Sequence, residues 1–114
     1  MEAIVFPLST IADLDAALQE SFSHPVMLFK HSQTCGTSAY AFEEVEEWLE
    51  GAGVRTFVVT AQTHREVSNE IARRLSVRHE TPQALLVRNG EVRWHGSHYR
   101  VTAEALHKAV AEKA

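Results

Sequence analysis

Residues 26–38 read Val26-Met27-Leu28-Phe29-Lys30-His31-Ser32-Gln33-Thr34-Cys35-Gly36-Thr37-Ser38. The continuous apolar run Val26–Phe29 is typical of a central strand that is covered on both faces. A short polar loop follows this run, and a helix is predicted to begin at Cys35 or its neighbours. The stretch therefore predicts a strand that passes into a helix, with a thiol at the junction.

Cys35 is the only cysteine among the 114 residues. A helix N-terminus carries unpaired N–H groups and the positive end of the helix dipole, so it stabilises a nearby thiolate, the reactive form of cysteine. With one thiol the chain cannot form an internal disulfide, and any thiol exchange must pass through a mixed disulfide with another molecule. The structural alternative is that a lone cysteine is a small buried hydrophobic residue.

Composition limits the partners and the compartment. The length fits a single domain over residues 1–114, and the net charge of −4 gives no basic surface for nucleic acid. Apolar runs such as Val26–Phe29 and Ala84–Val87 are far too short to cross a bilayer, so no membrane partner is expected. Residues 1–4 lack the basic and apolar regions of a signal peptide, and there are no paired cysteines. These features predict a cytoplasmic localisation.

The spacing of apolar residues predicts an α/β domain with the order helix, strand, helix, strand, helix, strand, strand, helix. Ser9 or Thr10 can cap the first helix together with Asp13, and His24-Pro25 is expected to end it. The strands on either side of the second helix must be parallel, while Asn89-Gly90 predicts a hairpin between the last two strands. The prediction is a four-stranded mixed sheet with helices on both faces.

The elements and their faces are expected at particular positions. The apolar faces of the first two helices are expected to comprise Ile11, Leu14, Ala17, Leu18 and Phe22, then Ala39, Phe42, Val45, Trp48 and Leu49. Gly51 and Gly53 are expected to stop the second helix, and its solvated face is expected to comprise Glu43, Glu44, Glu46 and Glu47. The other predicted elements are the strands Val54–Thr60, Ala84–Arg88 and Glu91–His95, a helix from about His64 to Leu75, and a final helix capped by Thr102.

This order, with Cys35 after a strand and Thr81-Pro82 before the hairpin, resembles the thioredoxin fold. In that family the proline at this place is cis and faces the active cysteine. The resemblance therefore implies a cis Thr81-Pro82 bond beside Cys35, although the two are far apart in sequence. It also implies that the Thr81 backbone hydrogen-bonds an extended thiol substrate, as a strand would. Thr81 and Pro82 are thus expected to bind substrate.

Within that fold, residues 29–35 followed by Ser38 are similar to the bacilliredoxin family of the YtxJ type. Its members carry a Lys-His-Ser stretch and a Thr-Cys-Pro-Ile-Ser active site, and the resemblance covers essentially the whole chain. Cys35, Thr34 and Ser38 carry over directly, as catalytic nucleophile, substrate contact and thiolate-stabilising hydroxyl.

Three further residues are candidates for stabilising the thiolate. Gly36 and Thr37 lie beside the thiol in sequence, where they replace the family proline and isoleucine. His31 lies four residues before Cys35 and can raise the local positive potential.

The bacilliredoxin resemblance implies a function. It implies removal of bacillithiol from S-bacillithiolated client proteins through a mixed disulfide on Cys35, which a second low-molecular-weight thiol or a reductase then clears. Bacillithiol is then a thiol co-substrate, and no bound cofactor is expected. His95 and His98 have a spacing that could suit a metal, but no helix carries them and no second cysteine joins them, so no metal site is predicted.

Two other functions remain open at this point. Cys35-Gly36-Thr37-Ser38 also resembles the Cys-Gly-Phe-Ser active site of monothiol glutaredoxins that carry iron–sulfur clusters. In those proteins a Gly-Gly segment after the last strand helps to hold glutathione, whereas this chain reads Gly96-Ser97-His98-Tyr99. The third possibility is a non-enzymatic binding module in which Cys35 is only a target of modification.

Overall fold

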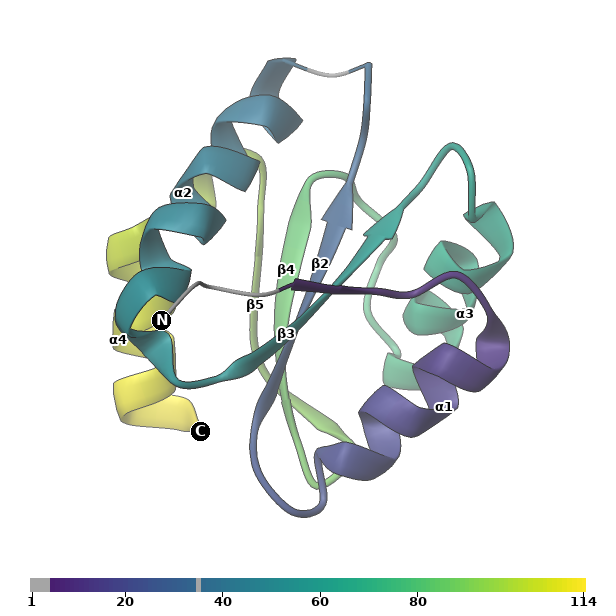
Figure 1. Cartoon of the computed structure of the whole chain (residues 1–114), viewed down its shortest axis with the longest axis horizontal. Coiled ribbons are helices and arrows are strands. Elements are labelled where there is room, and N and C mark those ends of the chain that lie inside the picture. Colours follow the sequence, from purple (N-terminus) through teal and green to yellow (C-terminus); the bar gives the residue numbers. More distant parts are fainter. Residues whose placement is uncertain (1–4, 35) are drawn as a thin grey trace.

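The computed structural model describes residues 5–34 and 36–114, and this part of the chain forms one mixed sheet with helices on both faces (Figure 1). The strands are β1 (Val5–Pro7), β2 (Val26–His31), β3 (Arg55–Thr60), β4 (Gln83–Arg88) and β5 (Glu91–Ser97). The helices are α1 (Ile11–Glu20), α2 (Gly36–Ala52), α3 (Arg65–Leu75) and α4 (Ala103–Lys113), with a short 3₁₀ helix η1 (His98–Arg100). The predicted α/β class and the predicted order of elements after β1 are confirmed.

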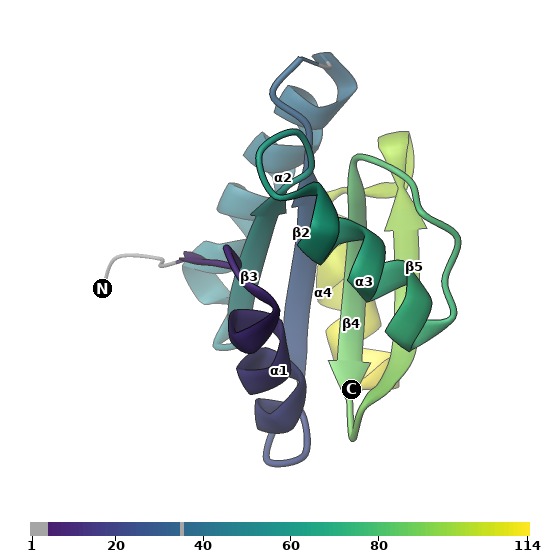
Figure 2. The same cartoon turned by 90° about the vertical axis from the view of Figure 1, so that its right-hand side faces the viewer.

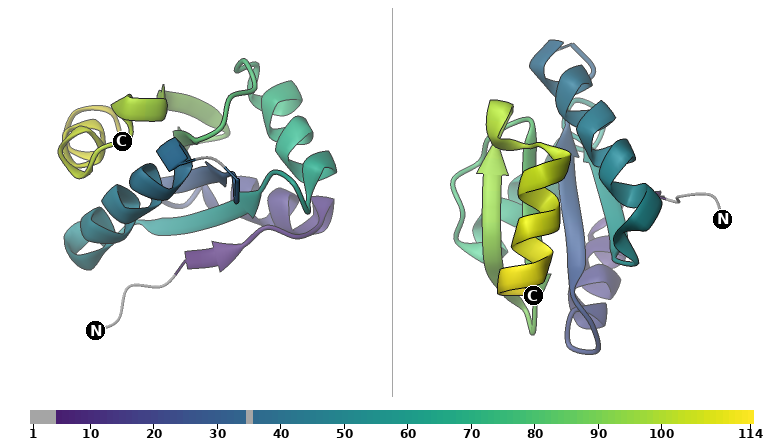
Figure 3. Two further views of the ribbon diagram at one scale, coloured as in Figure 1. Left: turned by 90° about the horizontal axis from the view of Figure 1, so that it is seen from above. Right: turned by 90° about the vertical axis from the view of Figure 1, so that its left-hand side faces the viewer.

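The strands lie in the order β1-β3-β2-β4-β5, so β2 is central. It pairs with β3 in parallel and with β4 in antiparallel orientation, and β4 and β5 form the predicted hairpin. Helices α1 and α3 cover one face of the sheet, while α2 and α4 cover the other (Figures 2 and 3). Because β2 and β3 are parallel neighbours, the polar segments that follow them emerge at the same edge of the sheet, the one at the carboxyl ends of these strands.

The apolar run of β2 faces two separate cores. Val26 and Leu28 pack beneath α1 and α3, whereas Met27 and Phe29 pack beneath α2 and α4. Successive side chains of a strand point to opposite faces, so a strand covered on both sides is apolar at every position. The uninterrupted run therefore reflects the central position of β2.

The prediction of four strands was wrong, because the sheet has five. The additional strand, β1, is only three residues long and pairs in parallel with β3, with Phe6 opposite Phe57. A segment this short that ends in Pro7 carries too few residues to show an alternating pattern. Its pairing with β3 places it at the edge of the sheet.

Helix α1 begins as predicted and ends earlier than predicted. The Thr10 hydroxyl accepts a hydrogen bond from the Asp13 N–H in a complete capping box. The helix ends at Glu20, before His24-Pro25. The next residue, Ser21, contacts the Asn89-Gly90 turn: its carbonyl accepts a hydrogen bond from the Asn89 N–H and its hydroxyl accepts one from the Gly90 N–H. Phe22, expected on the apolar face, is 56% exposed because it lies beyond the helix.

Helix α2 differs from its prediction both on its apolar face and on its solvated face. Ala39 is exposed, and Ala41 is buried beneath the helix instead. Glu44, expected on a solvated face, accepts a hydrogen bond from the Ala103 N–H at 3.0 Å. A carboxylate at a helix N-terminus satisfies a free N–H group and complements the dipole, so Glu44 connects α2 to the start of α4. The predicted stop is confirmed at Gly53, whose φ of +64° favours glycine, but not at Gly51, which lies within the helix.

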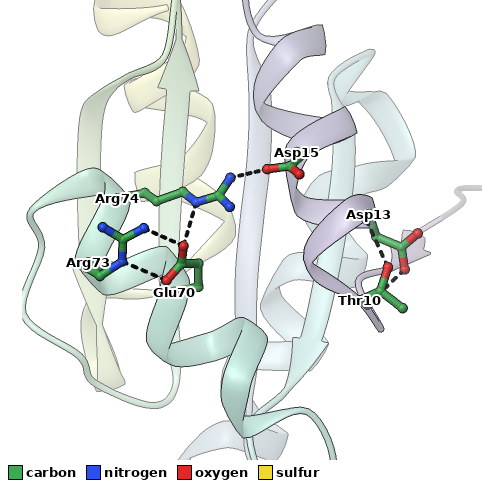
Figure 4. A network of polar contacts seen from close by, with 6 residues as sticks. All are labelled: Thr10, Asp13, Asp15, Glu70, Arg73 and Arg74. Atoms are coloured by element: carbon green, nitrogen blue, oxygen red, sulfur yellow. Dashed lines mark hydrogen bonds and ion pairs between the residues drawn. The ribbon is translucent and has the colours of Figure 1, made fainter.

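A polar network joins α3 to α1 on the other face (Figure 4). Glu70 accepts hydrogen bonds from Arg73 and Arg74, and Arg74 also donates to Asp15 of α1. The two guanidinium groups lower the pKa of Glu70 to about 2. The residues of α3 in this network lie beyond its first turn, so the residues of the first turn take part in none of these ion pairs.

Candidate active site

The candidate site lies where β2 leads into α2, at the edge of the sheet where β2 and β3 end (Figure 1). β2 extends to His31, two residues beyond the predicted strand, and α2 is described from Gly36. Cys35, the predicted nucleophile, lies outside the described residues. The residues before and after it in the sequence are described, and they define the surroundings of the site.

The Ser38 hydroxyl connects the first turn of α2 to the end of β2. Ser38 is fully buried, and its Oγ accepts a hydrogen bond from the Ser32 N–H at 2.8 Å. The same Oγ lies 2.8 Å from Nδ1 of His31. A hydroxyl has one proton to donate, so the protonation of His31 decides where that proton goes. With Nδ1 bare, Ser38 donates to His31; with Nδ1 protonated, Ser38 accepts and its own proton is free for a third partner.

His31 is half-buried and lies between two aromatic rings. Its ring lies 4.9 Å from that of Phe42 in an edge-on arrangement and 6.1 Å from that of Phe29. Burial lowers the pKa of His31 below its usual range, which favours the neutral imidazole. The role of His31 as a source of positive potential stays a prediction, and the structure adds a hydrogen bond between His31 and Ser38.

A side chain that sequence analysis missed, Gln62, holds the loop before Cys35. Its amide nitrogen donates to the Ser32 hydroxyl at 2.6 Å and to the Thr34 hydroxyl at 3.2 Å. Its amide oxygen accepts from the Gln33 N–H at 3.1 Å. The only sequence signal for Gln62 is its place directly after β3, since parallel neighbouring strands end at one edge of a sheet. Thr34 is exposed here, as a substrate contact would require.

The Thr81-Pro82 peptide bond is cis, as predicted. Lys30 of β2 pairs with Gln83 of β4, so the residues just before β4 lie beside those just after β2. Accordingly, Thr81 and Ser32 line one cavity. Pro82 is buried, and its carbonyl accepts a hydrogen bond from the His98 N–H at 3.0 Å. The Thr81-Pro82 segment thus lies beside the loop that precedes Cys35, while its predicted position beside Cys35 itself falls outside the described residues.

Lys30 places a buried amine beneath the same edge. The residue is fully buried, and its Nζ lies 3.1 Å from Nδ1 of His79. Burial lowers the pKa of Lys30 to about 8. Burial, followed by the charge of Lys30, lowers the pKa of His79, which favours a neutral ring that accepts a hydrogen bond from the ammonium group.

Gly36 and Thr37 make few contacts. Gly36 is exposed, and a Cβ added there would meet nothing within 4 Å, so space does not require a glycine. Thr37 is half-buried, and within residues 5–34 and 36–114 its hydroxyl forms no hydrogen bond. Their role in stabilising the thiolate stays a prediction.

The described residues form neither a membrane-spanning helix nor a metal-binding cluster. No helix among them is long and apolar enough to span a membrane. They contain no group of three or more metal-ligating side chains, and His95 and His98 belong to no such group.

The chain is similar to known proteins both in its sequence and in its fold. The sequence model of the family described as monothiol bacilliredoxin BrxC matches residues 6–106. A solved structure described as a candidate oxidoreductase with a thioredoxin fold is 30% identical, with a TM-score of 0.86 and coverage of 93% of each chain. Thioredoxin of Fasciola hepatica is 18% identical, with a TM-score of 0.78, over 96% of this chain and 100% of its own. Thioredoxin of Trypanosoma brucei brucei is 15% identical, also with a TM-score of 0.78, over 98% and 92%. These similarities confirm the thioredoxin fold.

Proposed function

Because this chain belongs to the monothiol bacilliredoxin family, and is therefore a thiol–disulfide oxidoreductase, we propose that it removes bacillithiol from S-bacillithiolated client proteins. The observation that carries the proposal is the pairing of a single cysteine with a serine three residues later. Ser38 stands where a dithiol oxidoreductase has its resolving cysteine. A hydroxyl cannot resolve a disulfide, so the bound thiol must leave by reaction with another molecule.

The proposed reaction is a thiolate exchange in two steps. The Cys35 thiolate attacks the bacillithiol sulfur of the mixed disulfide, a new S–S bond forms to bacillithiol, and the client leaves as its thiolate. A second low-molecular-weight thiol, as thiolate, then attacks the bacillithiol sulfur on Cys35. This step restores the Cys35 thiolate and releases a disulfide of the two small thiols. No net oxidation occurs in the first step, and the second small thiol supplies the reducing electrons.

Ser38 and His31 are proposed to set the thiol chemistry together. A helix N-terminus and a donated hydrogen bond both favour a thiolate. Ser38 can donate to sulfur only if it does not donate to His31, which requires a proton on His31 Nδ1. We therefore assign His31 as a positioning residue that acts through Ser38. Thr34 and the Thr81 backbone are proposed to contact the substrate.

The partners and compartment follow from this chemistry as proposals. Bacillithiol enters as a substrate and leaves as a product, so the reaction needs no bound cofactor. A cytoplasmic localisation is consistent with a reaction that consumes reduced small thiols. The partners are the S-bacillithiolated client proteins and the thiol that clears Cys35.

Client-thiol release tests the proposal. A protein carrying one bacillithiol disulfide should be reduced by the wild type and not by Cys35→Ser or Cys35→Ala. The same client carrying glutathione or coenzyme A shows whether bacillithiol is the preferred thiol. Equal rates for wild type and Cys35→Ser would overturn the proposal. An absorbance spectrum of the purified protein tests the other family resemblance, since an iron–sulfur cluster would colour it.

A further inference from the structure

A polar cavity of about 250 Å³ opens beside the loop that precedes Cys35. Its lining residues come from the segments that follow β2 and β3, from α3 and from the segment before β4. Figure 2 shows α3 and the segment before β4 on one face of the sheet. The side chains that line it include Ser32, Gln62, Arg65, Ser68, His79 and Thr81. Pockets for complete drug-sized ligands run from about 300 to 1,000 Å³, so this one has room for one end of a small molecule.

The charge around the cavity favours an anion. Arg65 is exposed at the first turn of α3, and within residues 5–34 and 36–114 it forms no ion pair. The buried Lys30 amine reaches His79, a lining residue, from below. No carboxylate of the described residues lines the cavity; Glu80, next to His79, accepts a hydrogen bond from the Ser97 hydroxyl of the hairpin. A chain with a net charge of −4 thus has a locally cationic cavity.

The cavity also contains a buried donor without a partner. Ser68 is fully buried, yet its hydroxyl forms no hydrogen bond with the described residues. Buried polar groups are nearly always satisfied, so an unpaired hydroxyl on a lining residue points to a partner that the described chain does not supply. The adjacent helix end is open as well, since His64, the N-cap of α3, provides no side-chain cap. The free N–H groups of a first helical turn bind anions.

We propose that this cavity binds the carboxylate-bearing end of the low-molecular-weight thiol, with Arg65 as the cation and Ser68 as a hydrogen-bond donor. The inference rests on the proposed function, and it names the part of the protein that recognises the small thiol. Bacillithiol carries malate carboxylates at the end remote from its sulfur, so it has the required group. Ser32 lines the cavity, so the cavity adjoins the loop that precedes Cys35 in the sequence. Thr81 lines the cavity, so a thiol docked on its backbone can extend toward Arg65.

Binding is tested without exchange in the Cys35→Ser variant. Reduced bacillithiol should shift the amide NMR signals of Ser68 and Asn69, and neutral 2-mercaptoethanol should leave them in place. Glutathione should also shift these signals, by an amount that depends on how well it fits the cavity. Arg65→Ala should weaken binding of bacillithiol about tenfold, the value of one charge-assisted hydrogen bond of about 1.4 kcal/mol. Arg73→Ala removes the same charge from α3 outside the cavity and should bind as the parent does. Shifts confined to other parts of the protein, or equal weakening by both substitutions, would overturn the cavity proposal.

Exchange kinetics separate this inference from the proposed function. For one client peptide, the ratio of kcat/KM for its bacillithiol disulfide to that for its 2-mercaptoethanol disulfide should fall about tenfold in Arg65→Ala. An unchanged ratio in an active enzyme would overturn the cavity and leave the proposed function standing. Binding at Ser68 and Asn69 by a protein that exchanges neither disulfide would support the cavity and overturn the proposed function.

Discussion

The Ser38 Oγ and the His31 Nδ1 lie 2.8 Å apart, although the two residues are seven positions apart in sequence. The turn from β2 into α2 brings them together, and the Ser32 N–H adds a second hydrogen bond to the same oxygen. The single proton of Ser38 can go to the His31 imidazole or, in the proposed mechanism, to the Cys35 thiolate. The state of His31 decides between them.

Ser38→Ala should raise the pKa of the Cys35 thiol by about one unit. A hydrogen bond to a charged group is worth about 1.5 kcal/mol, which corresponds to about one pKa unit. The thiolate absorbance measured against pH gives the midpoint. Thr37→Val removes the neighbouring hydroxyl and should have a smaller effect, because Thr37 is not buried in this hydrogen-bond network. An unchanged midpoint in Ser38→Ala would show that Ser38 does not donate to the thiolate.

Ser38→Cys should convert the protein to a dithiol enzyme. A thiol at this position can attack the mixed disulfide on Cys35 from within the chain, so bacillithiol should be released without a second small thiol. The products to measure are free bacillithiol and an internal disulfide, detected by the loss of two hydrogens in the protein mass. Ser23→Cys, on an exposed loop outside the site, is the control. Persistence of the adduct in Ser38→Cys would contradict the assignment of residue 38 to the resolving position.

His31 should carry a proton on Nδ1 when Cys35 is a thiolate. The ¹⁵N chemical shifts of the His31 ring distinguish the two neutral tautomers and the imidazolium. In Cys35→Ser the Nδ1-protonated population should be lower, because no anion draws the Ser38 proton away. A ring with bare Nδ1 in both proteins would remove His31 from the account of thiolate stabilisation. His107, exposed on α4, provides an internal reference.

Lys30→Met should make the protein more stable at pH 7, by up to about 3 kcal/mol. The pKa of Lys30 is about 8 in the fold, below its ordinary value of 10.5, so the unfolded chain binds more protons between these values. Wild-type stability therefore rises from pH 8 to about 10.5, and the advantage of Lys30→Met shrinks over the same range. Urea unfolding at several pH values measures this. Lys108→Met, at an exposed position, is the control; a pH-independent difference for Lys30→Met would contradict the buried charge.

Gly36→Pro should stabilise the fold by about 0.5–1 kcal/mol, seen as a rise of a few degrees in Tm. Gly36 is the first residue of α2, where proline is favoured because its fixed φ suits the helix and no N–H is needed. A Cβ there meets nothing within 4 Å. Gly53→Ala should lower the Tm instead, because φ is +64° at that position. A lower Tm for Gly36→Pro would show that the Gly36 N–H has a structural partner.

Most of the fold could be predicted from the sequence, because the spacing of apolar residues matches the positions of the strands and helices in the sheet and its two covering layers. Val26–Phe29 is apolar throughout, which only a strand between two helix layers requires. Thr10 with Asp13 and the Asn89-Gly90 turn are local signals, and each is realised in the structure. The short β1 could not be predicted, since its three residues are held by pairing with β3.

The candidate site was predictable in part. Thr81-Pro82 and Ser38 were identified through family resemblance, but the bond between Ser38 and His31 depends on how β2 turns into α2. Gln62 and Arg65 were not identified, because their approach to residues 32–34 and Thr81 comes from the pairing of β2 with β3 and β4. Contacts between distant segments leave no pattern in the spacing of one sequence.

The transfer of bacillithiol to Cys35 is tested most directly by the mass of the protein, and of the adduct on Cys35, during a single turnover. One equivalent of S-bacillithiolated client is mixed with the reduced protein without any other thiol, quenched with acid and analysed by mass spectrometry. The account predicts bacillithiol attached to Cys35 and an equal amount of client thiol released. A client protein joined to Cys35 by a disulfide, or a client released with Cys35 unmodified, would contradict it.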